Sequence, residues 1–98
     1  MKQKVIVIKK EFANDFITRE AGEKLRHVIE DSFARKEQLE LDFTGLTVAS
    51  TSFFDEGIAK LKFSGWTKEQ LGKYVHFKGL HPGDQKVLKT VCRLRGLD

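Results

Sequence analysis

The chain has 98 residues, 40% of them hydrophobic and 33% charged, with one proline, one cysteine and eight phenylalanines. This length predicts a single domain over residues 1–98, and the composition excludes a disordered or low-complexity protein. The net charge of +4, from 18 basic and 14 acidic residues, permits contact with nucleic acid or acidic partners without requiring it.

The first predicted element is a strand over residues 4–9. This run is continuous and rich in Val and Ile, which is typical of a strand that is covered on both faces. Residues 12–17 follow, with a turn signal at Asn14-Asp15. We interpret them as either a loop with anchoring aromatic rings or a brief second strand.

A long helix is predicted over residues 18–35. Thr18 is a good N-cap residue. One apolar stripe recurs at helical spacing and consists of Ala21, Leu25, Val28, Ile29 and Phe33. Gly22 in the helix interior costs about 1 kcal/mol relative to Ala, which predicts a close approach of the helix to the sheet at this position.

The centre of the chain combines a buried strand, a turn with three hydroxyl residues and the start of a helix. Residues 39–43 alternate between apolar and acidic side chains, which is the period-2 pattern of a strand. Ser52 and Asp55 resemble a capping box with Asp in place of Glu, and the acids there complement the helix dipole. This helix is predicted over residues 53–63 and ends at Gly65.

Three more elements are predicted after this helix. Thr67 and Gln70 form a second capping-box signature, which predicts a short helix through Leu71 toward Lys73, and residues 74–78 alternate as a strand. Pro82 is well placed in the first turn of a final helix. The alternation of strands and helices predicts an α/β layer structure whose strands run mostly parallel.

Four segments carry a resemblance to a known family: residues 16–26, Asp42-Phe-Thr-Gly45, Ser50-Thr-Ser-Phe-Phe-Asp-Glu56 and Leu80-His-Pro82. Over nearly its whole length the chain resembles the STAS-like domain family of unknown function. That family is similar to the STAS domains of anti-sigma-factor antagonists and sulfate transporters. The resemblance implies a small single-domain STAS-like α/β fold, with a mixed or mostly parallel sheet of about three to five strands and helices packed mainly on one face.

The resemblance also implies a non-enzymatic regulatory domain that docks on a protein partner through the hydroxyl turn and the helix after it. In bacterial anti-sigma-factor antagonists, a histidine-kinase-like ATPase phosphorylates a Ser at the start of a helix. On this chain that position falls on Thr51 or Ser52, with Ser50 in place of the usual Asp. The predicted partner-binding residues are Ser50, Thr51, Ser52, Phe53, Asp55 and Glu56.

The same turn also has a purely structural interpretation. The residue types predict that at least one of Ser50, Thr51 and Ser52 caps the helix, and capping can coexist with phosphorylation. Both roles remain open from the sequence.

Catalysis is not predicted. An alternative interpretation makes Asp42, Asp55 and Glu56 a hydrolytic carboxylate pair or a divalent-metal site. Acids after a helix start or at a strand end are ordinary, however, and the spacing of the three histidines gives no metal-ligand pair. We therefore expect no catalytic residue, no metal ion and no cofactor.

A basic nucleic-acid-binding module is the alternative function. Its surface would use the C-terminal helix and the Lys-rich N-terminus, including Lys10, Lys86, Lys89 and Arg93. Nucleic-acid modules usually add stacking aromatic residues or a helix-turn-helix, and neither is evident here. The sequence therefore favours a solvated basic face over a nucleic-acid surface.

The sequence predicts a cytoplasmic protein without membrane contact. No apolar run approaches the ~20 residues needed to cross a bilayer, and the apolar run near the N-terminus is too short for a signal-peptide core. The one cysteine, Cys92, fits a reducing compartment, and its place in an amphipathic helix predicts a core position.

Overall fold

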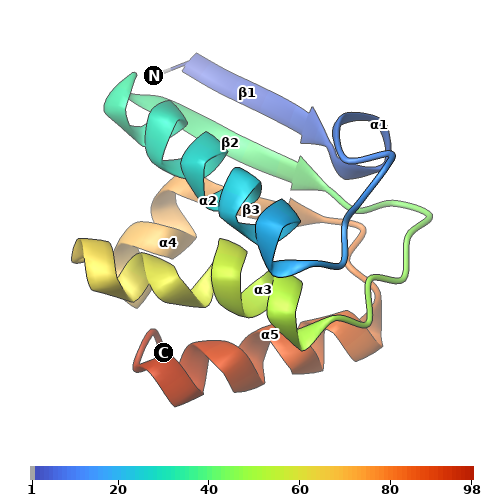
Figure 1. Ribbon diagram of the computed structural model, residues 1–98. Coiled ribbons are helices and arrows are strands. Elements are labelled where there is room, and N and C mark those ends of the chain that lie inside the picture. The colour runs from blue at the N-terminus through green and yellow to red at the C-terminus, as the bar shows by residue number, and fades with distance from the viewer. Residues whose placement is uncertain (1) are drawn as a thin grey trace.

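Strands and helices alternate in the computed structural model, which describes residues 2–98 (Figure 1). In chain order the elements are β1 (Lys2–Val7), α1 (Ile8–Glu11), α2 (Arg19–Ala34), β2 (Glu37–Asp42), α3 (Thr51–Gly57), the 3-10 helix η1 (Ala59–Ser64), α4 (Lys68–Tyr74), β3 (Val75–Lys78) and α5 (Pro82–Arg95). The predicted α/β layer structure is confirmed.

The sheet has the strand order β1-β2-β3, and both pairings are parallel. Val5 of β1 lies opposite Glu40 of β2, which lies opposite His76 of β3. The described residues therefore form a three-stranded, fully parallel sheet, as the mostly parallel prediction requires.

Helices cover one face of this sheet and leave the other open. Ile6, Leu41 and Val75 are buried on the covered face, whereas Val5 and Val7 on the opposite face are 51% and 38% exposed. The prediction that helices pack mainly on one face is confirmed. The expectation that the first strand is covered on both faces is wrong, because its Val residues reflect the preference of β-branched side chains for strands and not burial.

The first strand lies two positions earlier than predicted, at Lys2–Val7, because Ile8 already begins the short helix α1. Residues 12–17 form a loop, which is one of the two alternatives that the sequence left open. Phe12 fixes this loop to the core: its side chain is buried and packs edge-to-face on Phe53, with ring centroids 6.0 Å apart.

Helix α2 begins as predicted, because the Thr18 side chain accepts a hydrogen bond of 3.1 Å from the backbone N–H of Ala21. Gly22 faces α3 and not the sheet, which corrects the expectation. A Cβ atom at Gly22 would lie 2.7 Å from the Cβ of Glu56 and 2.8 Å from the carbonyl oxygen of Phe53. The glycine therefore allows α2 and α3 to approach one another closely.

The helix predicted over residues 53–63 is divided into α3 and η1, and the break falls at Ile58. The predicted stop at Gly65 is confirmed, since its φ of 84° places it in the left-handed conformation. Thr67 caps α4 by accepting from the N–H of Gln70 at 3.1 Å. Pro82 opens α5, and the His81 side chain caps this helix. Among residues 2–98, no helix combines the length and apolarity that crossing a membrane would require.

Candidate functional site

The hydroxyl turn is held in place by a buried carboxylate from another helix. Asp84 in the first turn of α5 is only 2% exposed. Its two oxygens accept hydrogen bonds from the backbone N–H groups of Val48 at 2.7 Å and Ala49 at 2.8 Å. Ala49 has a φ of 50°, a left-handed conformation that costs a non-glycine residue about 1–2 kcal/mol. The hydrogen bonds that Asp84 accepts fix the backbone of the segment that leads into α3.

Ser50 is the N-cap of α3. Its Oγ accepts a hydrogen bond of 3.1 Å from the N–H of Phe53 and donates one to the carbonyl oxygen of Ile17. The expectation that one of the three hydroxyl residues caps the helix is confirmed. The capping box of Ser52 and Asp55 is wrong, because α3 begins at Thr51 and both residues therefore lie inside the helix.

The three hydroxyl residues differ in their exposure to solvent. Ser50 is 7% exposed and occupied by its two hydrogen bonds, so its role lies within the fold. Ser52 is half-buried and Thr51 is exposed. Of the two predicted phosphoacceptors, Thr51 is therefore the more exposed residue.

The two phenylalanines after the turn belong to the core. Phe53 and Phe54 are both fully buried, with their ring centroids 5.7 Å apart. Phe54 also packs against Phe43, at the end of the central strand, with ring centroids 6.0 Å apart. Phe53 was predicted to bind a partner, but in this fold its side chain is buried and packs against Phe12 and Phe54.

Asp55 is buried in α3 and connects this helix to its two neighbours. The guanidinium of Arg95 on α5 donates from Nε to Oδ1 and from Nη2 to Oδ2, both at 2.8 Å. Arg19 on α2 donates to the same carboxylate at 3.1 Å. The hydrogen bonds from Arg95, followed by those from Arg19, hold the pKa of Asp55 below its ordinary value even though burial raises it.

Glu56 makes a parallel set of contacts. It accepts hydrogen bonds from Lys60 at 2.6 Å, from Arg26 at 2.8 Å and from Arg19 at 3.2 Å. These contacts, with that of Lys60 the largest, lower the pKa of Glu56 from 4.5 to about 2. Asp55 and Glu56 were predicted to bind a partner and to lie in the first helical turn. They lie in the second turn with their charges paired inside the fold, so the exposed part of the predicted site is Thr51 and Ser52.

The carboxylates do not gather into a hydrolytic or metal site. Asp42 accepts a hydrogen bond of 2.9 Å from the N–H of Thr44 at the end of β2, whereas Asp55 and Glu56 are occupied by basic side chains. Among residues 2–98, no group of three His, Cys, Asp or Glu side chains could hold a metal ion. Cys92 lies in the core, and burial raises the pKa of its thiol to about 11.

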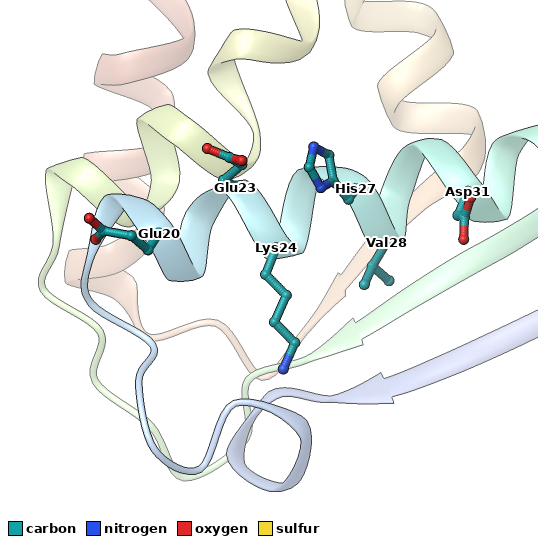
Figure 2. A pocket seen from close by; sticks show the side chains of 6 residues that line it. All are labelled: Glu20, Glu23, Lys24, His27, Val28 and Asp31. Atoms are coloured by element: carbon teal, nitrogen blue, oxygen red, sulfur yellow. The ribbon is translucent and has the colours of Figure 1, made fainter.

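Titratable side chains on α2 line a shallow hollow without converging on one point. Figure 2 shows Glu23 and His27 on one side of α2, with Lys24 and Asp31 on the other. Lys24 is used locally, since its Nζ donates to the carbonyl oxygen of Glu11 at 3.1 Å. This surface therefore lacks the geometry of a catalytic or ligand-binding cluster.

The hydroxyl turn borders a groove that sequence analysis did not identify. This groove, which we call the Thr51 groove, has a volume of about 220 Å³ and is lined by Thr51 together with Lys86, Val87, Thr90, Val91 and Leu94 of α5. Leu94 is 77% exposed. Val87, Val91 and Leu94 recur at helical spacing in the sequence, but that spacing does not show that Leu94 is exposed whereas Val91 is buried.

The two basic segments of the alternative function lie far apart. Lys86, Lys89 and Arg93 are exposed on α5, whereas Lys10 belongs to α1. Figure 1 shows β1 and α1 on the opposite side of the fold from α5. They do not form the continuous basic surface on which the nucleic-acid prediction depends.

A comparison with protein families gives one match. Residues 21–85 match the family described as a STAS-like domain of unknown function. The matched range begins in α2 and ends in α5, so it contains the hydroxyl turn and the helices that hold it. No curated protein and no solved structure matches the chain.

Proposed function

Because the chain belongs to the family of STAS-like domains of unknown function, we propose that it is a non-enzymatic regulatory domain that docks on a protein partner. The docking surface consists of Thr51, Ser52 and the α5 side of the Thr51 groove. The observation that carries this proposal is the position of Leu94, a large apolar side chain that is 77% exposed and lines the same groove as the exposed residue Thr51. Exposed apolar side chains that line a groove are typical of interaction surfaces.

The rigidity of this surface supports docking. Asp84 fixes the backbone before the turn, and the hydrogen bonds of Ser50 fix the start of α3. A partner therefore meets a preformed surface and loses little free energy in ordering it. This favours a protein interface built on the groove and the adjacent hydroxyls.

The partner in this proposal is a histidine-kinase-like ATPase, as the resemblance to anti-sigma-factor antagonists implies. The ATPase transfers the γ-phosphoryl group of ATP to the hydroxyl oxygen of Thr51 or Ser52, with loss of the hydroxyl proton and release of ADP. Thr51 is more exposed than Ser52, which favours Thr51 as the phosphoacceptor. The phosphate adds about −1.5 to −2 charges to a groove that Lys86 also lines, and so reverses the local charge without unfolding the domain.

Phosphorylation is tested by incubating the full chain with the cognate ATPase and Mg-ATP and measuring its intact mass. We expect the addition of one phosphoryl group to the wild type and none to the Thr51→Ala variant. Ser52→Ala is the matched control and should gain one phosphoryl group as the wild type does. If Ser52 is the acceptor, Thr51→Ala gains the group and Ser52→Ala does not. An unchanged wild-type mass rules out the phosphorylation step.

Docking is tested separately by titrating the unphosphorylated chain with the ATPase. Leu94→Asp is expected to weaken binding at least about tenfold, because an anchor at the centre of an interface typically contributes 1.4 kcal/mol or more. Val5→Asp, on the open face of the sheet, changes another exposed apolar residue away from the groove and should bind as the wild type does. Equal affinity of Leu94→Asp and wild type contradicts the proposed surface.

A further inference from the structure

A second groove, which we call the α4–α5 groove, lies on the other side of α5. It consists of two adjoining hollows of about 360 and 440 Å³ that share Leu88 and Lys89. The first hollow also contains Leu71 of α4 and Leu97, and the second contains Phe77 of β3. The two hollows extend beside α5, whose 14 residues span ~21 Å at ~1.5 Å per residue.

The floor of this groove is apolar and incompletely covered. Leu71, Phe77, Leu80 and Leu88 pack against the core but remain half-buried. They lie beside β3, which is an edge strand of the sheet. The groove therefore offers apolar surface in a shape that an elongated ligand could cover.

The rim of the groove is basic, and in the described part of the chain no acidic side chain neutralises its positive charges. Lys68, Lys89 and Arg93 line the groove, are exposed and take part in no ion pair among residues 2–98. This differs from Arg19 and Arg95, whose charges are neutralised by the buried acids of α3. Asp98 contributes one acidic side chain at one end.

We propose that the α4–α5 groove binds an acidic amphipathic helix of a partner protein. The apolar face of that helix would cover Leu71, Phe77 and Leu88, and its flanking carboxylates would meet the unpaired cations of the rim. Such helices bind grooves through apolar side chains at positions i, i+4 and i+7. The residues of α5 that line the groove run from Gln85 to Arg93 and span ~12 Å, which is about two turns of helix and enough for apolar side chains at i, i+4 and i+7.

The distribution of charge favours this occupant over a fatty acid or a nucleic acid. A fatty acid has one carboxylate at one end, whereas the three cations come from both α4 and α5. Single-stranded nucleic acid needs aromatic rings on which bases can stack. The one aromatic ring of the groove, Phe77, is stacked on Phe43, with ring centroids 6.3 Å apart.

This second groove is separate from the surface of the proposed function. Val87, Thr90 and Leu94 line the Thr51 groove, whereas Leu88, Lys89 and Arg93 line the α4–α5 groove. The inference therefore extends beyond the proposed function. Substitutions on the two sides of α5 distinguish the failure of one proposal from the failure of the other.

The test uses the full chain and a displayed library of helical peptides about 14 residues long, which matches the length of α5. We expect the enriched peptides to carry apolar residues at i, i+4 and i+7 with Asp or Glu beside them. The affinity of synthesised peptides is then measured by fluorescence anisotropy. Lys89→Glu and Arg93→Glu should each weaken binding about tenfold or more, because like charges then face one another across the interface.

Two further variants complete the design. Lys9→Glu on α1 reverses an exposed charge away from the groove and is expected to bind the peptides as the wild type does. Leu94→Asp, in the Thr51 groove, is also expected to leave binding unchanged. Circular dichroism verifies that each variant is folded.

Several results would overturn the inference. Enriched peptides without acidic residues contradict the charge complementarity. Equal affinity for the wild type and the Lys89→Glu/Arg93→Glu double variant, or loss of binding in Leu94→Asp alone, places the peptide elsewhere. In another outcome the library yields no enriched peptide, while the wild type binds oleate, anionic vesicles or single-stranded DNA and the double variant does not. That result assigns the groove to a different ligand.

Discussion

The carboxylate of Asp84 on α5 accepts a hydrogen bond of 2.8 Å from the backbone N–H of Ala49, although the two residues are 35 positions apart in the chain. Asp84 thereby determines the backbone conformation directly before the hydroxyl turn. Its second oxygen holds the N–H of Val48 at 2.7 Å. The proposed docking surface depends on this long-range contact.

The first prediction concerns Asp84→Asn. An amide has one oxygen, so one of the two backbone N–H groups loses its acceptor inside the protein. We expect the free energy of unfolding to fall by about 1–3 kcal/mol, measured by urea denaturation. The control is Asp31→Asn on α2, whose ion pair with Arg35 is exposed and should contribute at most about 1 kcal/mol. Equal stability of the two variants would contradict the role of Asp84.

The second prediction concerns Ala49→Gly. With a φ of 50°, Ala49 is strained by its Cβ atom, and glycine removes this strain. We expect the variant to be more stable than the wild type by about 0.5–1 kcal/mol. Ala34→Gly in the last residue of α2 provides the contrast, because a helical backbone offers no strain for glycine to relieve, and this variant should be no more stable than the wild type. A loss of stability in Ala49→Gly would show that the left-handed conformation is not strained.

The third prediction concerns the contact between α2 and α3. In Gly22→Ala the new methyl group would lie 2.7 Å from the Cβ of Glu56 and 2.8 Å from a backbone oxygen, so one of the helices must move. We expect a loss of about 1–3 kcal/mol in thermal or urea unfolding. Gly72→Ala in α4 meets nothing within 4 Å and should gain up to about 1 kcal/mol. Similar values for the two variants would refute the close approach.

The fourth prediction follows from the pKa of Glu56, which is lowered from 4.5 to about 2 by Lys60, Arg26 and Arg19. A lowered pKa means that the stabilisation is present above pH 4.5 and is lost as the pH falls towards about 2. The free energy of unfolding of the wild type should therefore fall over this pH range. In Glu56→Gln the fall should be smaller by about 1–3 kcal/mol. At neutral pH the variant is expected to be less stable, because it leaves basic side chains without their acid. Parallel pH profiles of the two proteins would contradict this assignment.

Local signals in the sequence predicted most of the elements correctly. Thr18 and Thr67 each cap the helix that follows them, and Gly65 ends η1, because these events depend on a few neighbouring residues. The three strands were likewise visible as short apolar or alternating runs. The exposure of one face of the first strand was not visible in the sequence, because Val5 has the same strand preference whether it is buried or exposed.

The details of the candidate site depend on contacts that are distant in the chain. Either Ser50 or Ser52 could begin a helix by residue type, and Ser50 is selected where Asp84 and Ile17 fix the preceding backbone. If Ser52 began the helix, Asp55 and Glu56 would lie in its exposed first turn, which is how the sequence was interpreted. Their partners Arg19 and Arg95 come from α2 and α5, and the sequence does not show which charges meet.

Helix α5 is bonded to the segment around α3 at both of its ends. Asp84 in its first turn binds the backbone of Ala49, and Arg95 in its last turn binds Asp55. An insertion of one residue between these two contacts would rotate one end by ~100° relative to the other and break a contact. The length of α5 is thus constrained by its two charged ends. The exposed side chains between them that line the grooves, unlike the buried Val91 and Cys92, are free to differ in size and charge, so the domain could change its partners without changing its fold.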